Sequence, residues 1–156
     1  MIEPGQVAPD FALLDADGRE VSLASLRGEW AVLFFYPRDN TPGCTSEACD
    51  FRDLDADYRG LGARVIGISP DGAASHDRFA AKHRLTYTLL SDPGGELAQR
   101  YGVSAEKRMY GRVSQGIART TFLLDPEGVV RKVYRKVKVA GHAAGVLADL
   151  RAMTSK

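Results

Sequence analysis

The sequence predicts an α/β fold in which helices flank a mixed central sheet and a β-hairpin forms the amino end. Two observations predict this class. Strand-like and helical segments alternate through the middle of the chain, as in parallel βαβ units. Hairpin signals lie near both ends and add antiparallel strands at the edges. The chain has 156 residues, 44% of them hydrophobic, and no linker or repeat interrupts it. Residues 1–156 are therefore expected to form one domain.

Seven strands are expected, and the third is the most diagnostic. Residues 31–36 are continuously apolar and rich in aromatic side chains, which is typical of a central strand covered on both faces. The first two strands flank a turn that Gly18 allows through a positive φ. The expected strands are 11–14, 21–23, 31–36, 65–69, 87–90, 120–124 and 129–133.

Four helices are expected between these strands. The first carries apolar residues at helical spacing and is stopped by Gly60 and Gly62. The second takes Ser75 as its N-cap. The residues from Val103 to Arg119 show no periodicity and are expected to be irregular. The expected helices are 45–59, 75–85, 96–101 and 142–153.

Charge and hydropathy exclude several classes of protein. The 21 Lys and Arg residues nearly balance the 20 Asp and Glu residues, so no overall field attracts nucleic acid. The basic run 131–138 is expected to be a solvated edge strand. The longest apolar run, Trp30 to Tyr36, is far shorter than the ~20 residues of a membrane span. The amino terminus has no secretory signal, so a cytoplasmic protein is expected, and nothing suggests a nucleotide, flavin or haem cofactor.

Residues 36–49 join a buried strand to a helix and contain both cysteines of the chain. Thr41 is a good N-cap and Pro42 favours the first helical position, so the helix begins here and Cys44 lies in its first turn. Unpaired backbone N–H groups and the positive end of the helix dipole then favour the thiolate over the thiol. Gly43 leaves room for a reactant beside the sulfur. The pattern predicts that Cys44 is a nucleophile.

Cys49 lies five positions further along the same helix. Helix geometry puts the two Cα atoms roughly 8–9 Å apart, whereas a disulfide needs less than about 7 Å. A bond between the two cysteines would therefore require a turn of helix to unwind, which makes the pair a candidate two-state redox element. Taken alone, Cys49 also fits a buried structural thiol.

A metal site is the weaker interpretation of these cysteines. The C-x4-C spacing supplies only two thiolates, and the three histidines, His76, His83 and His142, have no close metal-ligand spacing. The spacing also differs from the C-x-x-C pattern of dithiol exchangers. No metal is expected.

Pro37, Thr41 and Cys44 form the pattern P-x-x-x-T-x-x-C, which resembles the active-site signature of the peroxiredoxins. The local sequence T-P-G-C-T-x-E-x-C resembles one subgroup, the bacterioferritin comigratory protein or peroxiredoxin Q type. The resemblance extends over nearly the whole chain, through 9–11, 91–92, 101–103 and 116–125. It implies a thioredoxin-like fold, in agreement with the mixed sheet expected above.

The resemblance also implies roles for the site residues. Cys44 would be the peroxidatic cysteine, Thr41 would hydrogen-bond the peroxide, Pro37 would shield the sulfur from water and Arg119 would supply a cationic clamp. Thr41, Gly43 and Arg119 would then bind the substrate, which is hydrogen peroxide or an organic hydroperoxide. Donors and positive charge aimed at the breaking O–O bond stabilise the charge that develops there. The product is a sulfenic acid.

Cys49 resembles the resolving cysteine of this subgroup. Some relatives carry the resolving cysteine on the following helix, and others carry one near the carboxy terminus, but this chain has no cysteine after Cys49. An intramolecular disulfide with Cys44, recycled by a thioredoxin-type reductant, is the scheme that the resemblance implies, with a monomer as the expected state. Glu47 is a secondary candidate as an acceptor from the active-site arginine, although the helix dipole alone explains an acid there. The alternative is a redox-responsive binding module that unwinds without catalytic turnover.

Overall fold

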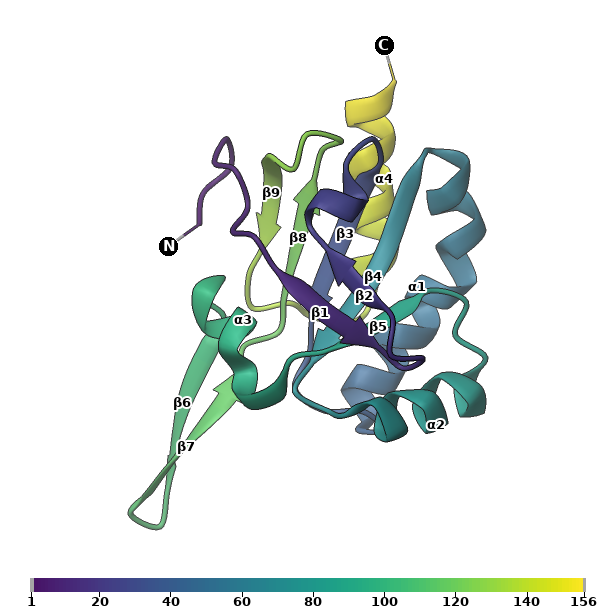
Figure 1. The fold of residues 1–156 in the computed structure, drawn as a ribbon. Coiled ribbons are helices and arrows are strands. Elements are labelled where there is room, and N and C mark those ends of the chain that lie inside the picture. The colour runs from purple at the N-terminus through teal and green to yellow at the C-terminus, as the bar shows by residue number, and fades with distance from the viewer. Residues whose placement is uncertain (1, 156) are drawn as a thin grey trace.

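A computed structural model describes residues 2–155, and the side chains of all of these except 106–109 and 112–115. A seven-stranded sheet forms the centre of the molecule, in the order β2-β1-β5-β4-β3-β8-β9, and a separate hairpin pairs β6 with β7 (Figure 1). The strands of the main sheet are β1 (Ala12–Asp15), β2 (Glu20–Ser22), β3 (Trp30–Phe35), β4 (Ala63–Ser69), β5 (Thr88–Ser91), β8 (Thr120–Leu124) and β9 (Val130–Tyr134).

The sheet is mixed, as the sequence predicts. β3, β4 and β5 run parallel at the centre, while the pairs β1–β2, β1–β5, β3–β8 and β8–β9 are antiparallel. The β3–β8 register sets Phe35 opposite Thr120. This register places Arg119, the residue before β8, at the end of the sheet where β3 leaves it.

Helices cover both faces of the sheet. The helices are α1 (Pro42–Gly60), α2 (Ala73–His83), α3 (Glu96–Arg100) and α4 (His142–Thr154), with short 3₁₀ turns at η1 (Ala24–Leu26) and η2 (Pro93–Gly95). Side chains alternate along β3, so that Val32 and Phe34 pack with α1, α2 and α4, whereas Leu33 and Phe35 pack with α3 and η1. Tyr58 of α1 donates a hydrogen bond to the Ala143 carbonyl at 2.7 Å and ties α1 to α4.

The stretch from Val103 to Arg119 is not irregular, and the expectation is wrong there. It contains β6 (Ser104–Met109) and β7 (Arg112–Ile117), which pair with each other in a hairpin that extends away from the main sheet (Figure 1). The two loop residues Tyr110 and Gly111 both have positive φ, as a two-residue type I′ turn requires. The strands are mostly polar and pair only with each other, so the hydrophobic periodicity that marks other strands is missing.

The start of α2 also differs from the expectation. Gly72 is the N-cap and the helix begins at Ala73, two residues before Ser75. The Ser75 hydroxyl donates instead to an Asp39 carboxylate oxygen at 2.8 Å, so a tertiary contact takes the side chain that would have capped the helix.

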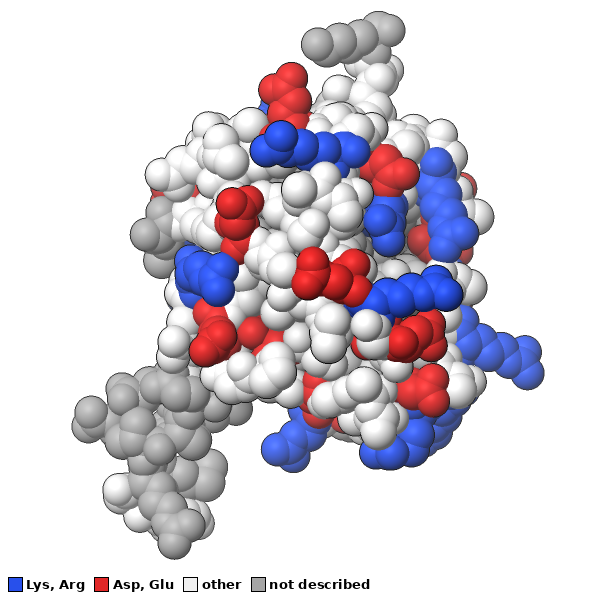
Figure 2. Space-filling model, viewed as in Figure 1, with Lys and Arg blue, Asp and Glu red and all other residues white. Residues whose placement is uncertain are grey.

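The described surface carries both signs of charge. On the face shown in Figure 2, basic and acidic side chains are interspersed over the body of the molecule, in keeping with the net charge of +1. In the basic run on edge strand β9, Arg131 and Lys132 contact Asp125 and Asp149 at 3.5 and 2.8 Å. Within the part of the chain that is described, no helix combines the length and apolar character that crossing a bilayer demands.

Candidate active site

The loop from β3 to α1 delivers Cys44 to the start of a long helix. Thr41 has the extended conformation of an N-cap, with φ −85° and ψ 151°, and Pro42 is the first helical residue, as predicted. Cys44 is therefore the third residue of α1. The Thr41 hydroxyl does not cap the helix but donates to the Arg38 carbonyl at 3.0 Å, which leaves its oxygen lone pairs free to accept.

Arg119 contacts the sulfur of Cys44 from the position just before β8. Its Nη2 lies 3.3 Å from Cys44 Sγ, although the two residues are 75 positions apart in the chain. Cys44 is only 1% exposed, and the N–H groups of Gly43 and Cys44 have no acceptor within the helix because they lie in its first turn. The sulfur thus lies beside a guanidinium in the first turn of a helix, an arrangement that stabilises a thiolate.

Glu47 holds Arg119 in this position. Its Oε1 accepts from Arg119 Nη1 at 2.7 Å, and its side chain is 1% exposed. Burial raises the pKa of the Glu47 carboxyl to about 7, while the charge of Arg119 opposes that shift. Glu47 Oε2 has no hydrogen-bond partner among the described residues. Glu47 thus accepts from one arm of the guanidinium, while the other arm contacts the sulfur.

Gly43 is the residue that lets Arg119 reach the sulfur. A Cβ at this position would lie 3.2 Å from Arg119 Nη2, closer than ordinary van der Waals contact. The room that the sequence predicts beside Cys44 is thus taken up by the guanidinium.

Cys49 lies in the same unbroken helix, half-buried, and both cysteines are free thiols. Because α1 is helical from Pro42 to Gly60, the two sulfurs cannot bond until its amino-terminal part unwinds. Arg52 Nη1 lies 3.6 Å from Cys49 Sγ. Each of the two cysteines therefore has an arginine at hydrogen-bonding distance.

The structure brings some predicted site residues together and leaves one apart. Gly43, Cys44 and Arg119 converge, and Thr41 occupies the N-cap position of the helix that carries Gly43 and Cys44. Pro37 follows β3 and is half-buried, but no described contact links it to the sulfur. Its shielding role stays a prediction.

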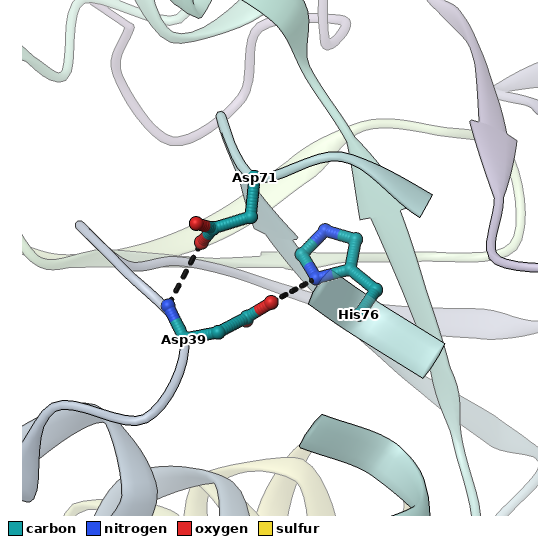
Figure 3. Close-up of side chains that lie close together, drawn as sticks. All are labelled: Asp39, Asp71 and His76. Carbon is teal, nitrogen blue, oxygen red and sulfur yellow. Dashed lines mark hydrogen bonds and ion pairs between the residues drawn. The ribbon is translucent and has the colours of Figure 1, made fainter. Parts of the chain in front are cut away.

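A second cluster fastens the β3–α1 loop to α2 (Figure 3). Asp39 and His76 are buried, with Asp39 Oδ2 2.8 Å from His76 Nδ1, and the Asp39 N–H donates to Asp71 at 2.8 Å. Burial raises the pKa of Asp39, but hydrogen bonds from His76 and Tyr36 outweigh it and leave the pKa below its usual value.

These three side chains are close enough to bind a cation, but their hydrogen bonds already account for their arrangement. Asp39 accepts from Tyr36, Ser75 and His76. Asp71 accepts from the Asp39 N–H and from the Ser69 hydroxyl at 2.7 Å. The cluster is therefore a hydrogen-bonded anchor for the loop that precedes Cys44.

Sequence analysis did not identify three side chains near the site: Arg52, Asp39 and His76. Arg52 follows Cys49 by three positions, a spacing that puts two helical residues on one face, so the sequence did contain a signal for this contact. Asp39 and His76 are 37 positions apart, and no local pattern connects them.

Comparison with known proteins places the chain in a family. The model of the AhpC/TSA family matches residues 4–133. The chain is 46% identical over 155 residues to peroxiredoxin Bcp of Bacillus subtilis, covering 99% of each chain. It is 47% identical over 149 residues to a putative peroxiredoxin bcp of Coxiella burnetii, covering 96% of this chain and 99% of that one.

A solved structure of the bacterioferritin comigratory protein of Xanthomonas campestris superposes with a TM-score of 0.92 at 42% identity, covering 98% of this chain and 100% of the other. The fold is thus thioredoxin-like. With the P-x-x-x-T-x-x-C loop, the Cys44–Arg119 contact and relatives that match over nearly their full length, the chain belongs to the AhpC/TSA family, in its bacterioferritin comigratory protein or peroxiredoxin Q group of peroxiredoxins.

Proposed function

We propose that the protein is a thiol peroxidase in which Cys44 reduces hydrogen peroxide or an organic hydroperoxide, Cys49 resolves the product, and a thioredoxin-type dithiol recycles the enzyme. The observation that carries the proposal is the 3.3 Å contact between Arg119 Nη2 and Cys44 Sγ at the amino terminus of α1. The proposed enzyme acts as a monomer, without a metal or organic cofactor.

In the first step the Cys44 thiolate attacks one peroxide oxygen. An S–O bond forms, the O–O bond breaks, and hydroxide or alkoxide leaves and takes up a proton. The sulfur is oxidised to sulfenic acid while the peroxide is reduced to water or alcohol. Arg119 and the N–H groups of Gly43 and Cys44 stabilise the charge that develops on the oxygens, Thr41 accepts a hydrogen bond from the peroxide, and Pro37 keeps bulk water from the sulfur.

In the second step α1 unwinds and Cys49 attacks the sulfenic sulfur. The S–S bond forms as the S–O bond breaks, and the oxygen leaves as water after protonation. An external dithiol then reduces the disulfide by thiol exchange and becomes oxidised itself. A free Cys49 in the helix that carries Cys44 supports this assignment.

Organic hydroperoxides are included because the relative from Xanthomonas campestris was solved in a study of its alkyl peroxide reduction activity. For this chain that substrate class is part of the proposal. Parallel assays with hydrogen peroxide and with cumene hydroperoxide would rank the two substrates.

A coupled assay tests the cycle. Thioredoxin, thioredoxin reductase and NADPH are mixed with peroxide and a catalytic amount of protein. Sustained NADPH consumption is expected for the parent and none for Cys44→Ser. Cys49→Ser should consume little NADPH with thioredoxin, retain turnover with small thiols, and accumulate sulfinic acid more readily. Parent-like turnover of Cys49→Ser with thioredoxin would show that Cys49 is not the resolving residue.

The second candidate, a redox-responsive binding module, is favoured by one feature: a Cys44–Cys49 bond requires a change of shape in α1. It predicts that one equivalent of peroxide forms the disulfide but that the coupled assay shows no sustained turnover. The same NADPH measurement therefore separates the two functions.

A further inference from the structure

The side chain of Arg52 lies one helical turn after Cys49 and contacts its sulfur. Arg52 Nη1 is 3.6 Å from Cys49 Sγ, within the range of an N–H···S hydrogen bond. The first reaction, at Cys44, does not use this pair, because Arg119 is the arginine that contacts Cys44.

Arg52 is held in place by groups outside the cysteine pair. The same Nη1 donates to the His83 carbonyl at the carboxyl end of α2 at 2.7 Å, and the Nε and Nη2 groups donate to Asp53 at 3.0 and 2.8 Å. The guanidinium is thus fixed both by its own helix and by α2. Arg52 is therefore already beside Cys49 before α1 unwinds.

The resolving step requires a charged Cys49. A thiolate is the nucleophile in attack on a sulfenic sulfur, whereas a neutral thiol reacts poorly. Cys49 lies beyond the first turn of α1, where the helix dipole and free N–H groups no longer act on it. A nearby cation is the remaining means of stabilising its thiolate.

We propose that Arg52 is a catalytic residue of the resolving step, in which its guanidinium stabilises the negative charge on the Cys49 sulfur as that sulfur attacks the Cys44 sulfenic acid. The inference rests on the proposed function. The two chemical steps would then use two separate thiol–guanidinium pairs, Cys44 with Arg119 and Cys49 with Arg52.

The other titratable groups around this pair do not replace Arg52. Tyr87 interacts with Cys49, but burial raises its pKa far above neutral, and its hydroxyl donates to the Ala48 carbonyl at 2.7 Å. Asp50 and Asp53 are acids, which disfavour a second negative charge nearby. The hydrogen bond to Asp53 raises the pKa of Arg52, and the Cys49 sulfur raises it further, while burial lowers it. Arg52 is therefore the cation among the described neighbours of Cys49.

The first test is independent of peroxidase activity. In a Cys44→Ser background Cys49 is the only thiol, because the chain has 2 cysteines. Replacing Arg52 by Met should slow alkylation of Cys49 by iodoacetamide at neutral pH about three- to tenfold. At strongly alkaline pH, where every thiol is ionised, the two proteins should react equally fast. Equal rates at neutral pH, or a difference that persists at alkaline pH, would overturn the proposal.

The chain offers a matched control for this substitution. Arg59 lies in the same helix, donates to the Thr86 carbonyl at 2.7 Å and contacts Asp55 at 3.2 Å, and among the described residues it forms no hydrogen bond with either cysteine. Arg59→Met should leave the alkylation rate unchanged. Arg52→Lys keeps the charge and should restore much of the rate. Loss of rate in Arg59→Met equal to that in Arg52→Met would assign the effect to helix packing and contradict the proposal.

The second test measures the resolving step itself. After one equivalent of hydrogen peroxide, acid-quenched samples are analysed by mass for sulfenic acid and disulfide. In Arg52→Met the loss of Cys44 thiol should be as fast as in the parent, disulfide should form about three- to tenfold more slowly, and sulfinic acid should increase at excess peroxide. Parent-like disulfide formation would refute the role of Arg52. A parent whose Cys44 fails to react would refute the peroxidase instead, while the alkylation test would still decide the Arg52–Cys49 link.

Discussion

At the scale of single residues, the environment of Cys44 depends on the absence of a side chain at Gly43. The guanidinium of Arg119 fills the space beside Gly43 and reaches the sulfur, with Glu47 as acceptor for its other arm. The three groups act as a unit, because displacing the guanidinium from either partner also moves it relative to the other.

Replacing Gly43 by Ala should separate stability from activity. Alanine is the better helix former, so the free energy of unfolding should rise by about 0.5–1 kcal/mol. The new Cβ, 3.2 Å from Arg119 Nη2, should displace the guanidinium by a few tenths of an ångström. We expect kcat/KM for peroxide to fall about three- to tenfold, because one donor to the transition state is misplaced.

Gly145→Ala is the matched control. Gly145 lies in α4, and a Cβ there would have nothing within 4 Å. It should give a similar gain in urea unfolding with unchanged kcat/KM. A Gly43→Ala enzyme with parental kcat/KM would show that the close approach of Arg119 is unimportant.

At the scale of the elements, the proposed cycle gives α1 two tasks that conflict. In that cycle α1 is helical at its start when Cys44 meets the peroxide, and it unwinds for Cys49 to reach Cys44. The loop before it is anchored by Asp39 and His76 (Figure 3). We therefore expect the proposed change of shape to be confined to α1, with its preceding loop held on α2.

Oxidation should increase amide hydrogen exchange in residues 42–49. One equivalent of peroxide would form the disulfide, break the first helical turns and speed exchange there about tenfold or more, because the N–H groups lose their acceptors. Mass spectrometry of peptic fragments measures this, and cleavage by trypsin at Arg52 should increase as well. Residues 143–154 of α4 serve as the internal control. A disulfide that forms without faster exchange in 42–49 would contradict the need for unwinding.

The Asp39–His76 contact should contribute several kcal/mol to the free energy of unfolding. His76 is 0% exposed, and its ring nitrogens lie 2.8 Å from Asp39 Oδ2 and 3.0 Å from the Leu90 carbonyl. His76→Leu leaves both acceptors without this partner, so the free energy of unfolding in urea should fall by about 3 kcal/mol.

His83→Leu is the comparison for this substitution. His83 belongs to the same helix but is half-buried, and its substitution should cost less than about 1 kcal/mol. Equal losses for the two histidines would show that the Asp39 contact contributes nothing special.

At the scale of the whole molecule, the half-buried His142 and the buried Glu47 make stability depend on pH in opposite directions. Burial, with a smaller effect of Arg119, lowers the pKa of His142 from 6.5 to about 4. Below pH 6.5 the unfolded chain therefore takes up a proton that the folded protein does not, and stability falls as pH falls through this window. The pKa of Glu47 is raised to about 7 in the folded protein, so the folded protein binds this proton more readily than the unfolded chain. The contribution of Glu47 to stability therefore increases as pH falls from about 7 to 4.5.

Urea unfolding at pH 7 and pH 5 measures both contributions. Relative to the parent, His142→Gln should gain about 1 kcal/mol on going from pH 7 to pH 5, after allowance for partial exposure of the ring, because it removes a group that destabilises the fold in acid. Glu47→Gln should lose stability relative to the parent over the same interval. The same sign for both variants would contradict the two assignments.

Much of the fold could be predicted because its signals are local. The apolar run of β3, the Thr41–Pro42 helix start and the glycines at turns each act within a few residues, and the structure has a strand, a helix start and turns at these places. The hairpin β6–β7 was missed because its strands are mostly polar, although Tyr110-Gly111 is the kind of two-residue loop that a hairpin uses. The helix start expected at Ser75 was wrong because its hydroxyl bonds Asp39 in place of the helix backbone.

The mixed α/β class, the position of Cys44 in the first turn of a helix and the presence of Cys49 in the same helix could all be predicted from local sequence, because backbone preferences and helix periodicity depend on neighbouring residues. The tertiary structure decided which charges meet these sulfurs. The strand order sets β8 beside β3 and so brings Arg119 to Cys44, and the packing of α2 places the His83 carbonyl where it orients Arg52 beside Cys49. Hydrogen bonds between distant residues follow from the arrangement of strands and helices in space, which no short stretch of sequence contains.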